Sequence, residues 1–472
     1  MRAYSYFGST CKENTPLKEV LSPYHHMVVS YVNVCTKEDA HMVLNIAKNA
    51  SKIAKTIPLH QRISWLLDVA QKLERLKEDF AKTITDEVGK PIRFSRIEVE
   101  RAVETIKLSA NAMLHVNGQT FDTEAMPSGK KTLAFYKREA VGVVLAITPF
   151  NFPFNLVAHK IAPALVAGNA VILKPSSQAP LCAFKLARLF IESPYATKDA
   201  LSLIYSGLGV NEALVESEIP RVISFTGSVG VGKEITCKAG IKKIALELGG
   251  NAATYIDTSA NSAQAAQRCA FGAFINSGQV CISLQRIYVH EAIYEAFSNA
   301  FVEETKTLRV GSPYEDETFI GPMVNQSAVE KAHRWVKSAL DEGAKLLHGF
   351  TCKDLMFEPT IMGDVQEEMS IVCEEVFAPI VSLIKVKNYE EAKQKMNASA
   401  YGLQYSLFSN DLAMVNDAIE HFEAGGVVVN DIPTLRFDVQ PYGGIKHSGI
   451  GKEGPYYALL DDYTQIKSVV IC

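Results

Sequence analysis

The chain has 472 residues, of which 47% are hydrophobic and 21% charged, and its formal net charge at pH 7 is −4. This length exceeds what one hydrophobic core normally supports, so we expect two or three domains. The ordinary composition excludes a disordered or fibrous chain, and the small net charge offers no attraction for nucleic acid or an anionic membrane. We therefore expect neither as a partner.

The first residues and the cysteines bear on the compartment. Residues 1–20 contain no apolar core long enough for a signal peptide, and no uncharged apolar run approaches the length of a membrane span. We therefore expect a cytoplasmic protein. The nine cysteines show no paired short spacing, so the sequence indicates neither a disulfide framework nor a metal site.

The first regular elements are helices. Apolar residues recur three and four positions apart over 38–55 and again over 61–89, which predicts two amphipathic helices. Gly89 and Pro91 end the second helix, since glycine favours a C-cap and proline cannot continue a helix. A third helix is expected over 97–112.

Short apolar runs follow, separated by helix-like segments. "VGVVLAI", "NAVILK", "RVISFT" and "KKIALELGGN" each combine β-branched residues with a polar end, as buried parallel strands do. Strands that alternate with helices predict an α/β fold with a doubly wound parallel sheet, which binds ligands at the C-terminal ends of its strands.

A second α/β series begins after Gly250, with strands expected at "AATYID", "RIYVH", "IVSLIKV" and "GGVVVND". A domain junction is therefore predicted near 247–251. Residues 122–140 differ, because they are polar and extended, and their alternating "TLAFYKR" predicts an exposed β-ribbon that needs a partner. Together with the C-terminal "DYTQIKSVVIC", this ribbon is a candidate oligomer interface.

Several strand ends carry residues suited to chemistry. Lys174 closes "AVILK", where its ammonium could reach a ribose or phosphate, although strand-end lysines are commonly just solvated. Asn151 follows another strand, where its amide could donate to an oxyanion or simply serve a turn. Glu247 lies in an apolar strand end, where a carboxyl is either a base with a raised pKa or one half of a buried ion pair.

Two further stretches are ambiguous on their own. "FTGSVGVGK" joins a strand to a helix start and so could hold a pyrophosphate, but it lacks the G-x-G-x-x-G spacing and could be a plain tight turn. Cys281, in "FINSGQVCISLQ", could be a nucleophile, although most buried cysteines only fill space.

The order of the motifs resolves these alternatives. "TPFNFP", "LKPS", "FTGSVGVGK", "LELGGN", "GQVCIS", "EEVFAP" and "PYGGIKHSGIGKEG" occur in this sequence, and together they resemble the aldehyde dehydrogenase superfamily from near residue 20 to near the C-terminus. The lactaldehyde, phosphonoacetaldehyde and non-phosphorylating glyceraldehyde-3-phosphate dehydrogenase branch is the most similar.

The resemblance implies a fold and a division of the chain. It implies a Rossmann-like NAD(P)-binding domain over 1–120 and 141–249, and a catalytic domain over 250–447. The remaining segments, 121–140 and 461–472, would form an oligomerisation arm. A homodimer or homotetramer is therefore expected.

The resemblance also implies roles for individual residues. Cys281 would be the nucleophile, Asn151 and the Cys281 backbone N–H the oxyanion hole, and Glu247 the general base that releases the acid. In the cofactor site, Lys174 and Glu375 would hold the two riboses and Phe377 would pack near the nicotinamide. The pyrophosphate would meet the turn at Gly227 and Ser228.

Cofactor preference depends on Ser177. Many NAD-preferring relatives have a glutamate there, which binds the adenosine ribose and would repel a 2′-phosphate. Serine has no charge that would repel this phosphate, so we expect that either NAD or NADP can bind, with a slight preference for NADP. Ala378 replaces a glycine that is common in relatives, a small change that we expect to be harmless.

The substrate is expected to be a small aldehyde with a hydroxyl or an anionic group, such as lactaldehyde or succinic semialdehyde. Phe152, His159 and Arg436 are the expected pocket residues, and Arg436 either pairs with an anionic tail or is a solvated loop arginine. Val280 before Cys281 weakens the glyceraldehyde-3-phosphate alternative, because phosphate-binding relatives often place a basic residue there.

Two other functions are disfavoured by the residues present. A non-catalytic protein that kept the fold should have lost Cys281, Glu247 or Asn151, and none is lost. Relatives that transfer the acyl group to coenzyme A generally lack a glutamate at the position of Glu247. The presence of Glu247 therefore argues against that reaction.

Overall fold

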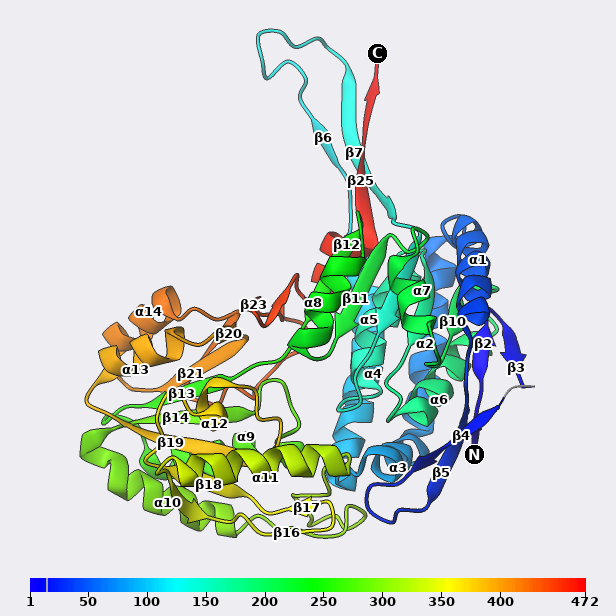
Figure 1. Cartoon of the computed structure of the whole chain (residues 1–472). Helices are drawn as coiled ribbons and strands as arrows, with labels where there is room; N and C mark the ends of the chain where they lie inside the picture. The colour runs from blue at the N-terminus through cyan, green and yellow to red at the C-terminus, as the bar shows by residue number, and fades with distance from the viewer. Residues whose placement is uncertain (14–15) are drawn as a thin grey trace.

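The computed structural model describes residues 1–13 and 16–472. Residues 14 and 15, which fall inside the expected cofactor-binding segment 1–120, lie outside the described residues. Two α/β bodies stand side by side, and a long β-ribbon that includes the C-terminus projects from the upper one (Figure 1). No helix among the described residues is long and apolar enough to cross a membrane.

The first body is built on an eight-stranded sheet of order β24-β12-β11-β8-β9-β10-β2-β3. Its five central strands are parallel, as expected: β8 (Val143–Ile147), β9 (Ala170–Lys174), β10 (Leu201–Leu203), β11 (Val222–Thr226) and β12 (Lys243–Glu247). Antiparallel strands were not predicted at the edges: β2 (Ser5–Phe7), β3 (Thr10–Lys12) and, from the far end of the chain, β24 (Gly449–Ile450).

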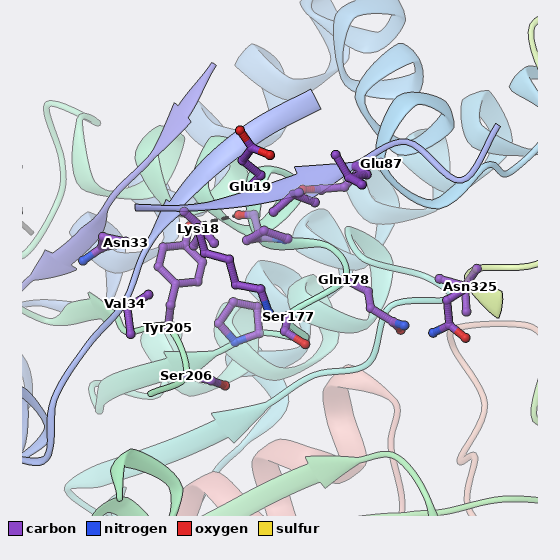
Figure 2. A pocket seen from close by; sticks show the side chains of 16 residues that line it. Lys18, Glu19, Asn33, Val34, Glu87, Ser177, Gln178, Tyr205, Ser206 and Asn325 are labelled. Atoms are coloured by element: carbon purple, nitrogen blue, oxygen red, sulfur yellow. Dashed lines mark hydrogen bonds between the residues drawn. The ribbon is translucent and has the colours of Figure 1, made fainter. Parts of the chain in front are cut away.

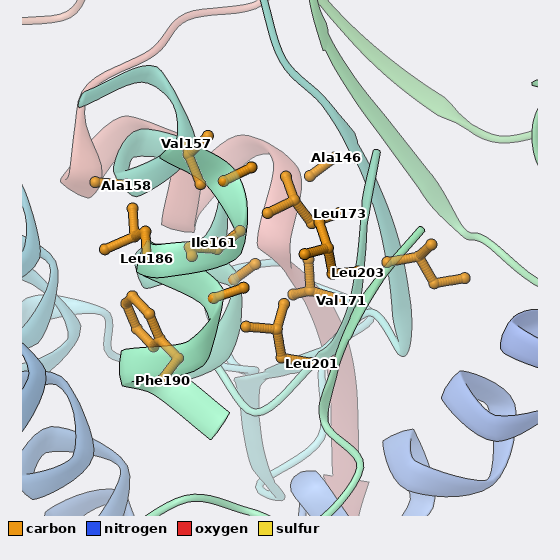
Figure 3. Packing of buried hydrophobic residues seen from close by; sticks show 14 of the residues in the cluster. Ala146, Val157, Ala158, Ile161, Val171, Leu173, Leu186, Phe190, Leu201 and Leu203 are labelled. Carbon is orange, nitrogen blue, oxygen red and sulfur yellow. The ribbon is translucent and has the colours of Figure 1, made fainter. Parts of the chain in front are cut away.

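The core of this body lies between the sheet and the helices α5 (Asn155–Val166) and α6 (Pro180–Ile191). Side chains two residues apart on a strand share a face, so Val171 and Leu173 lie beside Leu201 and Leu203 and point at the helices (Figure 3). Each buried leucine contributes roughly 1.5–3 kcal/mol. This packing fixes the strand ends that carry the site.

The N-terminal helices differ in part from the prediction. The helix expected over 61–89 is two helices, α2 (Leu59–Arg75) and α3 (Lys77–Val88), because the backbone at Leu76 (φ −101°, ψ 15°) leaves the helical region. Gly89 caps α3 with φ 72°, as predicted. The third helix, α4 (Ile92–Ala112), begins directly after Pro91, earlier than residue 97. The first helix, α1, spans Lys37–Ala54.

The second body has a seven-stranded sheet of order β15-β18-β19-β14-β13-β21-β22. All neighbours are parallel except β15 and β18. The strands are β13 (Ala252–Ile256), β14 (Leu284–His290), β15 (Lys345–His348), β18 (Thr360–Gly363), β19 (Ile380–Val386), β21 (Gln404–Phe408) and β22 (Gly426–Val429). The main helices are α9 (Ser262–Phe274), α10 (Tyr294–Lys306), α11 (Gln326–Asp341), α13 (Tyr389–Asn397) and α14 (Leu412–His421). The exact domain boundaries stay a prediction.

The projecting ribbon has three antiparallel strands: β6 (Gln119–Phe121), β7 (Leu133–Ala140) and β25 (Thr464–Ile471). The pairing of β7 with β25 runs from Ala140 with Thr464 to Leu133 with Ile471. The expected exposed ribbon is therefore present, and its two parts come from segments more than 300 residues apart. Its surface carries exposed apolar side chains, including Ile466 and Val470.

Candidate active site

Cys281 lies just after a left-handed turn between α9 and β14. Asn276, Ser277 and Gly278 have φ values of 52°, 55° and 68°. A side chain at Gly278 would place its Cβ 2.0 Å from the Ala378 carbonyl oxygen, so only glycine fits. The Ser277 hydroxyl donates to the Gly321 carbonyl at 2.8 Å. The surroundings thus hold a strained turn in place, as is common at functional sites.

The thiol of Cys281 lies where two cavities meet. The larger cavity, of about 580 Å³, and a smaller one, of about 230 Å³, both include Cys281 in their lining. The larger cavity is also lined by Asn151 and by every residue that the sequence assigned to the cofactor: Lys174, Ser177, Gly227, Ser228, Glu375 and Phe377. The smaller one is lined by Phe152 and Arg436, two of the three expected substrate residues.

Asn151 is held in a defined orientation next to the cysteine loop. It follows β8, is 3% exposed, and its Nδ2 donates to the Gln279 carbonyl oxygen at 3.0 Å. An amide nitrogen carries two hydrogens, and this bond uses one of them. The second hydrogen is free to serve a ligand in the cavity that Asn151 shares with Cys281.

Glu247 is buried at the end of β12, and its Oε2 has no hydrogen-bond partner among the described residues. Burial raises its pKa well above the usual value, and the nearby Glu453 raises it further, against the opposing charges of Lys160 and Arg436. Glu247 lines a small third cavity behind the site and also adds to the negative field at Cys281. An unpartnered buried carboxyl of this kind is suited to proton transfer.

The surroundings of Cys281 disfavour its thiolate form. Burial raises its pKa to about 12, the charge of Glu375 raises it too, and Arg436 together with a hydrogen bond to Tyr442 opposes the rise. Thiolate formation at neutral pH is therefore costly.

The residues around the larger cavity fit a dinucleotide. Ser228 is the N-cap of helix α8 (Val229–Lys238) and lines this cavity. Its hydroxyl accepts the Val231 N–H, and the N-terminus of the helix is suited to a pyrophosphate. Glu375 Oε1 accepts the Gly250 N–H at 3.1 Å, which leaves Oε2 for a ribose hydroxyl, and burial raises the pKa of this carboxyl to about 7. A Cβ at Gly249 would lie 2.2 Å from that Oε2. Lys174 ends β9 on the same cavity, and burial lowers its pKa.

His159 is placed differently from the prediction. It does not line the cavity that Phe152 and Arg436 share; instead it is 2% exposed on α5 and its Nε2 lies 3.0 Å from Asp438 Oδ1 and 3.4 Å from Arg436. The His159 Nε2 also lies 3.5 Å from the Thr105 hydroxyl, so the ring packs between α4 and the segment that carries Arg436 and Asp438. His159 therefore supports Arg436 rather than a substrate.

The smaller cavity has a strongly basic lining that the sequence analysis missed. Lys90, Arg101 and Arg268 line it together with Arg436. Glu98 also lines it and forms a buried ion pair with Lys90, so the arginines carry the positive charge of the lining. Arg101 makes a two-pronged bond to Asp438 at 2.8 and 3.0 Å, and Arg268 contacts Asp431 at 2.7 Å. Both arginines stay about one third exposed, so they can also reach a ligand.

Comparison with known proteins agrees with this geometry. The model of the aldehyde dehydrogenase family matches residues 10–469, so the chain belongs to this family. The predicted family, fold class and enzyme class, an NAD(P)-dependent aldehyde dehydrogenase, are thereby confirmed.

Relatives belong to the expected branch. A 3-sulfolactaldehyde dehydrogenase of Priestia megaterium is 42% identical over 453 residues, which cover 96% of this chain and 94% of that protein. A lactaldehyde dehydrogenase of Methanococcus aeolicus is 36% identical over 96% of this chain and 97% of its own. The crystal structure of an NADP-dependent glyceraldehyde-3-phosphate dehydrogenase from Bacillus halodurans, complexed with NADP, superposes with a TM-score of 0.97 at 32% identity, covering 100% and 99% of the two chains.

Proposed function

We propose that this enzyme oxidises a small aldehyde with a hydroxyl or anionic group to its carboxylic acid, with NAD or NADP as the acceptor. The observation that carries the proposal is the position of Cys281, between a cavity sized for a dinucleotide and a smaller cavity with a basic lining. The names of the similar proteins support this substrate class, because they include aldehydes with hydroxyl, sulfonate and phosphate groups.

The catalytic roles follow from the geometry. The Cys281 sulfur adds to the aldehyde carbon and its proton passes to solvent water, while the free hydrogen of Asn151 Nδ2 and the Cys281 backbone N–H stabilise the oxyanion. A dinucleotide held in the larger cavity would supply the hydride acceptor for this carbon, and the oxidised product is a thioester on Cys281. Glu247, with its raised pKa, is a strong base once ionised and takes a proton from the water that releases the acid.

The residues of the larger cavity bind the dinucleotide. Lys174 and Glu375 bind the two riboses, the turn at Gly227 and Ser228 receives the pyrophosphate, and Phe377 packs against the nicotinamide. Ser177, at the adenosine end, admits either NAD or NADP. All of these side chains reach the same cavity from separate strand ends, as the topology of a doubly wound sheet requires.

The substrate's polar group is bound by Arg436 and Arg101. Arg436 is almost buried, stacks on the Tyr442 ring at 3.8 Å and contacts Glu453 at 3.2 Å, so it is rigid. Arg101 is more exposed and lines the same cavity, and its bond to Asp438 uses Nε and Nη2, which leaves Nη1 for a ligand. An arginine fork matches a carboxylate, sulfonate or phosphate. A glyceraldehyde-3-phosphate activity is the second candidate, supported by this lining and by the Bacillus halodurans structure.

We further infer that the ribbon of β6, β7 and β25 joins copies of this chain into a homodimer or homotetramer. Its two long strands leave the rest of the molecule and expose Phe121, Leu133, Ile466 and Val470 at 50%, 53%, 55% and 61%. Apolar strand surfaces of this kind are normally covered by a partner. No further partner is proposed, and a cytoplasmic location remains our expectation.

The proposed function is tested by following reduced nicotinamide with NAD and NADP in parallel, on sulfolactaldehyde, lactaldehyde, succinic semialdehyde, glyceraldehyde-3-phosphate and propanal. We expect Cys281-dependent reduction that is fastest with a hydroxylated or anionic aldehyde. Arg101→Gln should raise KM for the anionic aldehydes about tenfold and leave propanal unchanged, since it removes one charge-assisted bond. A preference for propanal would contradict the proposed substrate class.

A further inference from the structure

A fourth cavity, different from the three described above, borders the cofactor cavity and shares Ser177 with it. This cavity, of about 380 Å³, lies between the N-terminal strands β4 (Leu17–Leu21) and β5 (Val28–Asn33) and the loop that follows β9 (Figure 2). Ser177 is the one residue that appears in the lining of both cavities. A group bound by Ser177 from the cofactor side therefore borders this cavity as well.

Lys18 on β4 supplies a positive charge at this place. Neighbouring residues on a strand point to opposite faces, and in Figure 2 the Lys18 side chain extends towards Ser177 while Glu19 lies on the other side of the strand. Within the described part of the chain, Lys18 makes no ion pair and no side-chain hydrogen bond. Its ammonium is therefore available to a ligand.

The other carboxylate in this lining does not compete for Lys18. Glu87 accepts the backbone N–H of Leu181 at 2.7 Å and of Cys182 at 2.8 Å, so both of its oxygens are already engaged. Burial also raises its pKa to about 7, which reduces its negative charge near neutral pH. Lys18 therefore supplies the cationic side chain of this lining.

We propose that Lys18 and Ser177 together bind the 2′-phosphate of NADP, so that the N-terminal strand β4 sets the choice between the two dinucleotides. An ammonium and a hydroxyl are both good donors to a phosphate monoester. NAD has only a hydroxyl at this position and gains nothing from Lys18. This inference rests on the proposed cofactor site. It adds Lys18 to that site, 156 positions before Lys174 in the sequence.

The test is a calorimetric titration of the whole protein with 2′,5′-ADP and with 5′-AMP, which differ only in the 2′-phosphate. We expect Lys18→Ala to weaken 2′,5′-ADP about three- to tenfold and to leave 5′-AMP unchanged, as for one partly exposed charge contact to phosphate. The matched control is Lys52→Ala, which removes an exposed lysine of α1 that lines neither cavity and should alter neither affinity.

The outcomes separate the two proposals. Unchanged binding of 2′,5′-ADP by Lys18→Ala, or an equal loss for both nucleotides, overturns the role of Lys18 while the cofactor site stands. If the wild-type protein binds neither nucleotide, the cofactor site itself is refuted. In turnover, the same variant should raise KM for NADP with kcat and the NAD constants unchanged, a pattern that a general loss of structure would not give.

Discussion

Asn151 has one amide hydrogen committed to the protein and one left for the reaction. Asn151→Ala removes the free donor, so kcat should fall about 10²–10³-fold, as for loss of one oxyanion donor. The steady-state rate with saturating NAD or NADP measures this. Asn169→Ala is the matched control, because the Asn169 amide is also buried and donates to the Ala164 and Tyr463 carbonyls, but it lines neither the cofactor cavity nor the substrate cavity. An equal loss in both variants would show that Asn151 acts only through packing.

The thiol of Cys281 should react slowly at neutral pH. Its pKa is raised to about 12, so the thiolate that reacts with iodoacetamide is scarce at pH 7 and increases as pH rises. We expect the modification rate of the Cys281 peptide, followed by mass spectrometry, to increase about tenfold per pH unit between pH 7 and pH 10. A plateau below pH 8 would mean that the free protein already holds a thiolate. The exposed Cys237 serves as an internal reference.

At this scale the sequence predicted residue identity better than residue environment. Cys281, Asn151 and the cofactor residues were identified because each lies in a short motif, and the structure brings them to one cavity. The basic lining was missed because its members lie far from their partners; Arg101 and Asp438 are 337 positions apart. His159 was misplaced because position along a helix does not reveal which layer its side chain enters.

At the scale of elements, the backbone conformation of the left-handed turn before Cys281 determines where the thiol lies. Gly278→Ala would bring a Cβ within 2.0 Å of the Ala378 carbonyl and force the turn to move. We expect kcat to fall at least tenfold, because displacing a nucleophile by about 1 Å costs on the order of 10²-fold.

A control separates this effect from unfolding. Gly343 also has a positive φ, of 100°, but nothing lies within 4 Å of its would-be Cβ. Gly343→Ala should therefore lower the melting temperature slightly and leave kcat unchanged. Loss of activity in both variants to the same degree would indicate general destabilisation instead of a displaced Cys281.

Helices and strands were predicted well where an apolar pattern extends over many residues. They were predicted poorly where contacts with distant segments determine the structure. The parallel strands and α1 follow from their apolar patterns. The break at Leu76 was not predicted, because the apolar spacing continues through it and only the backbone angle changes. The edge strands β2, β3 and β24 were missed because they have two or three residues and exist only by pairing with a neighbour.

At the scale of the molecule, the proposed assembly depends on the projecting ribbon. Ile466 and Val470 share one face of β25, and replacing Val470 with Asp puts a charge on this apolar surface. We expect Val470→Asp to convert the assembly to a smaller species, measured by light scattering after size-exclusion chromatography. Gln465→Asp, on the opposite face, should leave the assembly intact. An unchanged mass for Val470→Asp would refute the proposed interface.

The arrangement of whole bodies was the least accessible to the sequence. Alternating strands and helices predicted two α/β series, and the motif order predicted the family. Neither shows that the late chain returns to the first sheet, where β24 pairs with β12 and places Glu453 near Glu247. Such contacts depend on the packing of distant segments, and no local pattern records them.

The central claim is that Cys281 carries the acyl group and Glu247 activates the water that releases it. The most direct measurement is rapid mixing of Glu247→Gln with aldehyde and cofactor, followed by mass analysis of the quenched protein. We predict a burst close to one reduced nicotinamide per active site, slow turnover afterwards, and an acyl mass on the peptide that contains Cys281. No burst, or an acyl group on another residue, would contradict the account.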